Sequence, residues 1–323
     1  MFDPILVPLD GSQLAECVLP HIVAFSRSFK SHTTLLRMLE KNPSGTSVQL
    51  FDLLNWQIKK TESNLYLEKT KTLLQESGIN VRINVMEGLV AEGITDYAKN
   101  QGMKLIILSS HGKSGLTQWG ISSIAQKIIW SAPSSVLIIR AHQPEFQAVE
   151  QPAIPLYQRI LVPLDGSQRA ENVLPVVTKL AHYYNSQIHL IQVIQPPEMA
   201  RQLPLTREDI ELSNRIVARN QEEAAQYLEQ LKSRSYLEGL TVQTHLITSD
   251  NAATELHRIT VQENIDMVAL SAHGYSGNQQ WPYGSMVNNF IMYCAVPLLI
   301  VQDIPGKQEQ MPLETSSRER ADR

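Results

Sequence analysis

The sequence reads Ile5-Leu6-Val7-Pro8-Leu9-Asp10-Gly11-Ser12-Gln13 near its start, and the same residues return without change at 160–168. The second copy begins at 160 instead of 5, a shift of 155 residues. Another segment repeats in the same order, since Ser109-Ser110-His111-Gly112 is answered by Ser271-Ala272-His273-Gly274. Internal repetition on this scale indicates two copies of one domain, and a chain of 323 residues has room for both.

Short apolar runs alternate with longer amphipathic stretches in each copy. Runs that are apolar at every position, such as 105–108, suit strands covered on both faces. Strands alternating with helices predict parallel βαβ units, so each copy should be an α/β domain with an open, doubly wound, five-stranded parallel sheet and helices on both faces. The predicted strands are Ile5–Leu9, Thr34–Leu39, Val81–Met86, Leu105–Ser109 and Val136–Ile139, then Ile160–Leu164, Ile188–Ile194, Thr241–Ile247, Met267–Ser271 and Leu298–Val301.

The repeat divides the chain into domain 1 at 1–141 and domain 2 at 157–303. The segment 142–156 between them is polar and contains three prolines, which is typical of a linker. The tail at 304–323 is polar and charged, and we expect it to be disordered.

Two kinds of local feature carry further expectations. Long loops are expected at 41–56 and 196–206, each leading into the helix before the third strand of its repeat. Pro20 and Pro175 fall about eight residues into their helices and should kink them.

Composition excludes several classes of protein. Hydrophobic residues make up 43% and charged residues 19%, which is typical of a soluble globular chain. A net charge of −4 argues against nucleic acid as a partner. The start carries no export signal, and the longest apolar run, 290–301, is too short to cross a bilayer. We therefore expect a cytoplasmic protein with no membrane partner. Cys17 and Cys294 form no spaced cluster, which favours small core residues over a disulfide or a zinc site.

An aspartate follows the first strand of each repeat and precedes a helix that Ser12 or Ser167 can cap. Ligands of open α/β sheets lie at the carboxyl ends of the strands, so Asp10 and Asp165 would face the ligand crevice. The same aspartates could instead only stabilise the turn and the helix start. The local sequence leaves both interpretations open.

A glycine-containing turn follows the fourth strand of each repeat. It reads His111-Gly112-Lys113-Ser114-Gly115 in the first and His273-Gly274-Tyr275-Ser276-Gly277 in the second. Gly284 and Ser285 then precede an apolar helix, whose free backbone amides and positive dipole end could bind phosphate. The alternative is a tight turn with a helix cap. Recurrence at the corresponding place in both repeats favours the phosphate site.

Neighbouring motifs do not support other chemistry. Gly112-Lys113-Ser114 resembles the end of a Walker A loop, but Ile107 stands where its first glycine belongs. Neither turn carries the final glycine of a hydrolase nucleophile elbow. His111 and His273 adjoin no cysteine or acidic cluster, so we interpret them as turn-stabilising residues and not as metal ligands or catalytic bases.

Together these residues make both halves resemble universal stress proteins in their tandem form. The Val-Pro-Leu-Asp-Gly-Ser start, the Ser-His-Gly turn and the ending from Ala132-Pro133 to Ile139 are similar to that family. The nucleotide motif of the family is Gly, two residues, Gly, nine residues, Gly, then Ser or Thr. It falls on Ser271, Gly274, Gly284 and Ser285 in repeat 2, and on Ser109, Gly112, Ser122 and Ser123 in repeat 1. One glycine is thus replaced in repeat 2 and two in repeat 1.

The resemblance implies a binding site for ATP or a related adenine nucleotide, with Mg²⁺ accompanying the phosphates. It also implies a role in stress adaptation and a dimeric assembly, here an internal pseudo-dimer of the repeats or a homodimer of chains. The implied site in repeat 2 comprises Pro163, Leu164, Asp165, Val193, Ser271, His273, Gly274, Gly277, Gly284, Ser285 and Met286. The implied weaker site comprises Pro8, Leu9, Asp10, Met38, Ser109, His111, Gly112, Gly115, Ser122 and Ser123.

Three functions stay open at this point. The first is a nucleotide-binding stress-response module, with any ATP hydrolysis slow. The second is a scaffold or interaction protein of the same fold that binds no nucleotide, as the replaced glycines would allow. The third is an enzyme acting on ATP, for which the sequence offers no evident base and nucleophile. We expect repeat 2 to bind more tightly, because Gly284 lets phosphate approach and tolerates a positive φ where Ser122 would crowd it.

Overall fold

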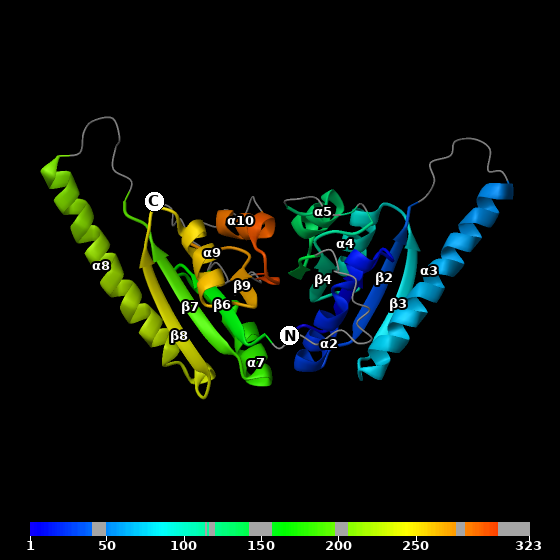
Figure 1. The fold of residues 1–323 in the computed structure, drawn as a ribbon, viewed down its shortest axis with the longest axis horizontal. Coiled ribbons are helices and arrows are strands. Elements are labelled where there is room, and N and C mark those ends of the chain that lie inside the picture. Colours follow the sequence, from blue (N-terminus) through cyan, green and yellow to red (C-terminus); the bar gives the residue numbers. More distant parts are fainter. Residues whose placement is uncertain are drawn as a thin grey trace, which may run out of the picture.

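The computed structural model describes residues 1–40, 50–113, 115, 120–141, 157–197, 206–275 and 282–302. The two repeats lie side by side, each with a long helix on its outer flank (Figure 1). The linker predicted at 142–156 and the tail predicted at 304–323 fall outside the described residues.

Each repeat contains five strands, and their positions match the predicted ones to within one or two residues. Repeat 1 consists of β1 (Ile5–Pro8), α1 (Gln13–Glu16), α2 (Leu19–Phe29), β2 (Thr33–Leu39), α3 (Leu50–Glu76), β3 (Val81–Glu87), α4 (Val90–Asn100), β4 (Leu105–Ser109), α5 (Ser123–Ser131) and β5 (Ser135–Ile139). Repeat 2 consists of β6 (Arg159–Leu164), α6 (Gln168–Glu171), α7 (Leu174–Tyr184), β7 (Gln187–Ile194), α8 (Arg207–Lys232), the 3₁₀ turn η1 (Ser235–Leu237), β8 (Thr241–Thr248), α9 (Ala252–Gln262), β9 (Met267–Ser271), α10 (Ser285–Tyr293) and β10 (Leu298–Val301).

The strand order confirms two doubly wound domains. It runs β3-β2-β1-β4-β5 in repeat 1 and β8-β7-β6-β9-β10 in repeat 2, and all neighbours within a repeat are parallel. In each sheet the order reverses between the first and the fourth strand of the repeat, β1 and β4 or β6 and β9. The carboxyl ends of these strand pairs are the topological switch points, where open α/β sheets bind ligands.

One antiparallel strand pair joins the two sheets into a single sheet of ten strands. Leu299 of β10 lies opposite Leu137 of β5, with Leu298 opposite Ile138 and Ile300 opposite Val136. Arg140 strengthens this junction, because its Nη2 donates to the carbonyl oxygens of Phe290 (2.9 Å) and Ile291 (2.6 Å) at the end of α10.

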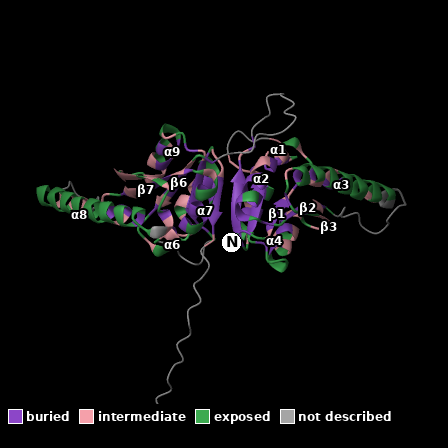
Figure 2. Ribbon diagram, turned by 90° about the horizontal axis from the view of Figure 1, so that it is seen from below, coloured by how far each residue is buried: buried purple, intermediate pink, exposed green. Residues whose placement is uncertain are grey.

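The helices cover both faces of this sheet, so that two apolar layers form. Alternate strand residues separate into them: Ile5 and Val7 pack with the layer under α2 and α7, and Leu6 packs with the layer under α5 and α10. The buried strands therefore lie in the middle of the molecule, with the exposed residues of α3 and α8 at its ends (Figure 2).

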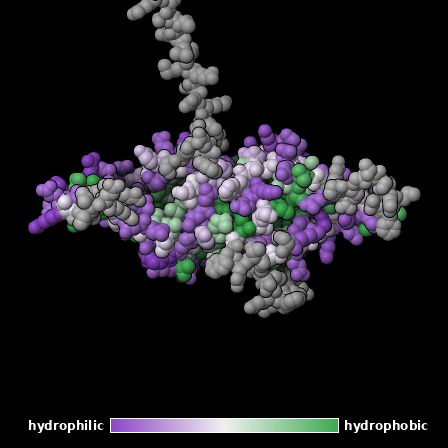
Figure 3. All heavy atoms as spheres, turned by 90° about the horizontal axis from the view of Figure 1, so that it is seen from above, coloured by the Kyte–Doolittle hydropathy of each residue, from purple (hydrophilic) through white to green (hydrophobic). Residues whose placement is uncertain are grey.

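Polar side chains make up most of the described surface on the face seen in Figure 3. Hydrophobic side chains form only small patches on the face shown in Figure 3. Among the helices that the structure describes, none is long and apolar enough to cross a membrane.

The prolines of the first helical segment break it instead of kinking it. α1 ends at Glu16, and α2 starts at Leu19 with Pro20 in its first turn; α6, α7 and Pro175 repeat this arrangement. A proline in the first turn costs no intrahelical hydrogen bond, since the amide there has no partner in the helix. The kink expected from the sequence was wrong for this reason.

The loop expected at 41–56 was also too long, because α3 already begins at Leu50. The corresponding boundary in repeat 2 agrees with the prediction. There Thr206 caps α8 in a capping box with Asp209, whose carboxylate accepts from the backbone and the hydroxyl of Thr206.

Tyr157 ties the start of repeat 2 to repeat 1. It is buried against Phe25 of α2 and Tyr184 of α7, with ring centroids 5.6 Å and 5.9 Å away in edge-on arrangements. Its hydroxyl lies 2.6 Å from Nδ1 of His21, and the Tyr184 hydroxyl donates to the Ala24 carbonyl at 2.8 Å. The two repeats are thus held together by aromatic packing as well as by the β5–β10 pair.

Two buried histidines should make the fold sensitive to acid. Burial lowers the pKa of His21 to about 4, and burial together with the nearby His245 lowers the pKa of His189 to about 4. Because an unfolded histidine titrates near 6.5, unfolding takes up protons as the pH falls from about 6.5 to 4. We expect the free energy of unfolding to decrease across this window, by up to about 1.4 kcal/mol for each unit of pKa difference.

Urea unfolding at a series of pH values measures this effect. Replacing both His21 and His189 by glutamine should flatten the dependence, whereas the same change at the exposed His182 should not. A double variant with the slope of the wild type would show that other groups carry the acid sensitivity.

Candidate functional site

The aspartate after the first strand of each repeat connects two turns at the switch point. Oδ1 of Asp165 accepts from the amide (3.0 Å) and the hydroxyl (2.6 Å) of Ser167, and its Oδ2 accepts from the Tyr275 amide at 2.6 Å. Asp10 makes the same bonds in repeat 1, to Ser12 and to the Lys113 amide at 2.7 Å. Each carboxylate therefore fixes the turn after the first strand against the turn after the fourth.

This bridge explains why a glycine stands in the second turn. A Cβ atom added to Gly274 would lie 2.1 Å from Oδ2 of Asp165, and one added to Gly112 would lie 2.1 Å from Oδ2 of Asp10. Neither distance is possible for real atoms, so the backbone must approach the carboxylate without a side chain. We call this arrangement, Asp165 with Gly274 and Asp10 with Gly112, the Asp–Gly contact. It supports the turn-stabilising interpretation of both aspartates, and their contact with a ligand stays a prediction.

The helix after the second turn begins at the same place in both repeats. The Gly284 amide donates to the Ala272 carbonyl at 3.0 Å, and the Ser122 amide donates to the Ser110 carbonyl at 2.8 Å. The N-termini of α10 and α5 are therefore held close to the ends of β9 and β4. This brings Gly274, Gly284 and Ser285 to one edge of the sheet, as the phosphate interpretation requires.

The two helix starts differ in how their amides are satisfied. In α5 the Ser122 hydroxyl accepts from the Ala125 amide at 3.2 Å, so one amide of the first turn is already occupied. Gly284, the N-cap of α10, has no side chain with which to do this. The first turn of α10 is thus better placed than that of α5 to donate to an anion.

The positive φ suggested for Gly284 does not occur. Its φ is −68° and its ψ is 164°, close to the −63° and 151° of Ser122. Any residue can adopt this conformation, and a Cβ atom on Gly284 would meet only the Ala272 carbonyl oxygen, at 3.8 Å. The difference between the repeats at this position therefore lies in the side chain and its cap and not in the backbone.

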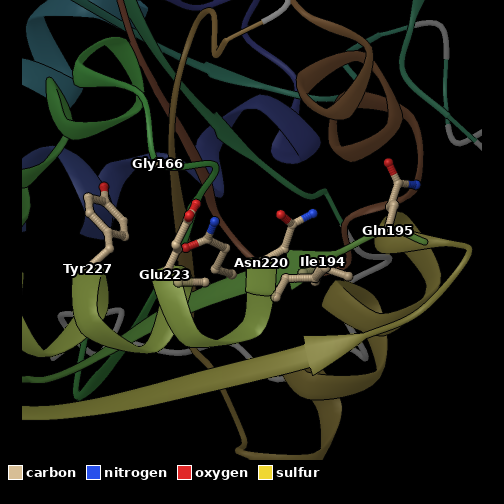
Figure 4. A pocket seen from close by; sticks show the side chains of 9 residues that line it. Gly166, Ile194, Gln195, Asn220, Glu223 and Tyr227 are labelled. Carbon is tan, nitrogen blue, oxygen red and sulfur yellow. The ribbon is translucent and has the colours of Figure 1, made fainter. Parts of the chain in front are cut away.

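A cleft of about 400 Å³ lies beside the Asp165 turn, between the end of β7 and α8 (Figure 4). Val193, one of the predicted residues, lines it together with Gly166, Gln192, Ile194, Gln195, Asn220, Glu223, Ala224 and Tyr227. Gln192 contributes to this lining, and its Oε1 is buried with no hydrogen-bond partner in the described part of the chain. A buried amide oxygen without a partner is costly, so a ligand that donates a hydrogen bond would stabilise this side chain.

Two of the predicted serines occupy corresponding positions but have different partners. The Ser109 hydroxyl donates to the Leu14 carbonyl at 3.0 Å, so it anchors α1. The Ser271 hydroxyl is buried and has no partner among the residues that the structure describes. A glycine at position 109 would forfeit the bond to α1, which gives this serine a structural role.

His111 has contacts within the turn, and the turn-stabilising role of His273 stays a prediction. His111 is buried, its Nδ1 lies 3.0 Å from the Ser110 hydroxyl, and burial followed by the positive charge of Arg140 lowers its pKa. No group of three or more His, Cys, Asp or Glu residues within the described ranges could hold a metal ion.

The remaining predicted residues divide by side-chain position. The side chains of Leu9 and Leu164 belong to the apolar core, so only their backbones border the crevice. Met38 packs on α4, where a Cβ atom on Gly93 would lie 2.2 Å from its Cε. Other predicted residues are partly or fully exposed, namely Pro8, Pro163, His273, Gly115, Ser123, Ser285 and Met286. Gly277 lies outside the described residues.

Sequence reasoning missed the side of the cleft that α8 provides. Asn220, Glu223 and Tyr227 are three or four residues apart and therefore share one helix face. The shared face of these polar residues was a usable signal, but the sequence predicted here only a helix leading to the third strand. Gln192, immediately before Val193, was missed in the same way.

Comparisons with known proteins agree with this architecture. The profile of the universal stress protein family matches residues 1–140 and 156–302. Universal stress protein MJ0531 of Methanocaldococcus jannaschii is 24% identical over 146 residues, which are 45% of this chain and 86% of that protein. Universal stress protein YxiE of Bacillus subtilis is 27% identical over 149 residues, 43% of this chain and 100% of that protein. Each of these relatives thus corresponds to one repeat.

A solved structure extends the likeness to both repeats. The crystal structure of a universal stress protein from Archaeoglobus fulgidus covers 94% of this chain and 99% of its own, with a TM-score of 0.63 and 16% sequence identity. At that identity the likeness concerns the fold. With two matched regions that together span most of its length, the chain belongs to the universal stress protein family.

Proposed function

We propose that this protein is a stress-response module that binds ATP or a related adenine nucleotide, with repeat 2 as its main site. The observation that carries this proposal is the cleft beside Val193, lined by Gln192, whose buried Oε1 has no hydrogen-bond partner among the described residues. The amino group of adenine or a ribose hydroxyl could donate to it. The Gly274 turn and the N-terminus of α10 would then receive the phosphates.

The chemistry proposed for this site is binding, with any hydrolysis slow. Both oxygens of the Asp165 carboxylate already accept hydrogen bonds from the protein, so this group is poorly placed to act as a base. Mg²⁺ is proposed to arrive with the phosphates, whose oxygens are the ligands that it prefers. A cytoplasmic location completes this proposal. The alternative, a scaffold that binds no nucleotide, is an outcome of the experiments below.

The first test is ligand-dependent stability. We expect ATP with Mg²⁺ to raise the melting temperature of protein that has been freed of bound nucleotide, because a ligand of the folded state stabilises it by roughly 2.7 kcal/mol at a hundredfold excess over its dissociation constant. Differential scanning calorimetry measures the shift. An unchanged melting temperature at millimolar ATP would favour the scaffold.

The matched control uses the two aspartates. Asp165→Ala should weaken ATP binding by roughly tenfold or more, a loss of about 1.4 kcal/mol, because the Gly274 turn is no longer held against β6. Asp10→Ala breaks the same contact in repeat 1 and should leave most of the binding intact. Equal losses in both variants would place the nucleotide in both repeats.

The second test compares the two helix starts. Gly284→Val should abolish most nucleotide binding, since the added side chain would stand where phosphate approaches the amides of α10. Ser122→Val makes the corresponding change in repeat 1 and should have little effect. The φ of Gly284 suits any residue and a Cβ atom there fits, so the variant should fold.

Calorimetric titration with ATP separates the outcomes. Gly284→Ser, which gives α10 the cap that α5 has, should fall between the wild type and Gly284→Val. If Ser122→Val were the more damaging change, the main site would lie in repeat 1.

The internal pseudo-dimer is also part of the proposal. We propose that the β5–β10 pair replaces the interface of a homodimer, because each of these strands would otherwise present an open edge. Sedimentation equilibrium should therefore give one species at the chain mass of 36.3 kDa. A stable species of twice that mass would overturn this part of the proposal.

A further inference from the structure

The two repeats differ at one position of the nucleotide cleft in a way that the family motif does not cover. Arg37 of β2 and Gln192 of β7 are separated by the 155-residue shift of the repeat. They hold the same place in the sheet, one residue after Leu36 and Ile191, which are opposite Pro8 and Pro163. One position thus carries a long cation in repeat 1 and a shorter neutral amide in repeat 2.

The Arg37 guanidinium lies directly against the turn after β1. A Cβ atom added to Gly11 would be 2.7 Å from its Nη1 and 3.2 Å from its Cζ. The same construction on Gly166 in repeat 2 meets only Nε2 of Gln192, at 3.8 Å, which is an ordinary contact. The guanidinium therefore fills the space beside Gly11 that remains largely open beside Gly166.

The Arg37 guanidinium also contacts the long helix α3. Cζ of Arg37 lies 5.3 Å from the ring centroid of Tyr66 on α3, within the range of a cation–π interaction. The corresponding tyrosine of α8, Tyr227, lines the open cleft and donates its hydroxyl to Glu171 at 3.2 Å. In repeat 2, the glycine turn, the tyrosine and the strand residue thus enclose a cleft. In repeat 1, the Arg37 side chain lies between the corresponding turn and tyrosine.

We infer that Arg37 occupies the part of the repeat 1 site that corresponds to the cleft of repeat 2, and that the residue at positions 37 and 192 decides which repeat binds nucleotide. This inference rests on the proposed function. To admit a base or ribose, repeat 1 would have to move Arg37 away from Gly11 and Tyr66, and would lose both contacts. Repeat 2 pays no such cost, because Gln192 leaves the space beside Gly166 largely open.

Exchanging the two side chains tests the inference. The wild type should bind one ATP per chain in equilibrium dialysis with Mg²⁺. Arg37→Gln should bind a second, more weakly because Ser122 still caps α5. Gln192→Arg should bind none, and the double exchange should bind one, in repeat 1. Arg82→Gln removes one positive charge at an exposed position of β3 and should behave as the wild type does. Thermal unfolding without nucleotide identifies any variant that fails to fold.

The outcomes separate this inference from the proposed function. If the wild type binds one nucleotide and Arg37→Gln still binds one, the inference is wrong and the proposed function stands. If Arg37→Gln loses the nucleotide bound by the wild type, Arg37 is a ligand contact and the inference is also wrong. If neither protein binds nucleotide, the proposed function fails and the inference fails with it. If only Arg37→Gln binds, Arg37 closes repeat 1 and the assignment to repeat 2 is wrong.

Discussion

The geometry of both switch points depends on a carboxylate that bonds to two turns at once. Asp165 joins the turn after β6 to the turn after β9, and the absence of a side chain on Gly274 allows the approach. This bond thus joins directly two turns that lie far apart in the sequence. The aspartate and the glycine therefore recur together in the sequence, because the bond from the aspartate to the second turn requires a residue without a side chain there.

Repeat 1 preserves this bridge and differs around it. Its helix α5 has a serine cap, its Ser109 hydroxyl is bonded to α1, and its Arg37 lies against Gly11. In each case the group of repeat 1 contacts another part of the protein, whereas its counterpart in repeat 2 lacks that contact. These replacements are what a domain would show if it kept the fold and satisfied its own polar groups in place of a ligand.

Most of the fold could be predicted from the sequence, because strands buried on both faces read as continuous apolar runs and the repeat gave two observations of each element. The errors arose at helix boundaries, where different local sequence signals predict different start and end residues. Pro20 was placed inside a helix, since sequence alone does not show that the chain leaves the helix after Glu16. The residue before Leu50, the first of α3, is Gln49, which is not among the side chains preferred at a helix N-cap. Of the candidate site, the glycines and aspartates were predictable from recurrence. The roles of Gln192 and Arg37 were not predictable from recurrence, because the two residues differ between the repeats. Their roles also depend on which side chains lie across the cleft.

The covalent fusion of the two halves gives the β5–β10 junction a property that separate chains lack. A homodimer has the same residue at corresponding positions in both subunits, so a substitution that closes one site closes both. In a single chain the local concentration of one half around the other is fixed by the linker and does not fall on dilution. In the internal pairing through β5 and β10, the partner of each half is the other half and not a copy of itself. Either half can accumulate changes that would be harmful in a symmetric dimer, and the pair can divide its work between a half that binds and a half that supports.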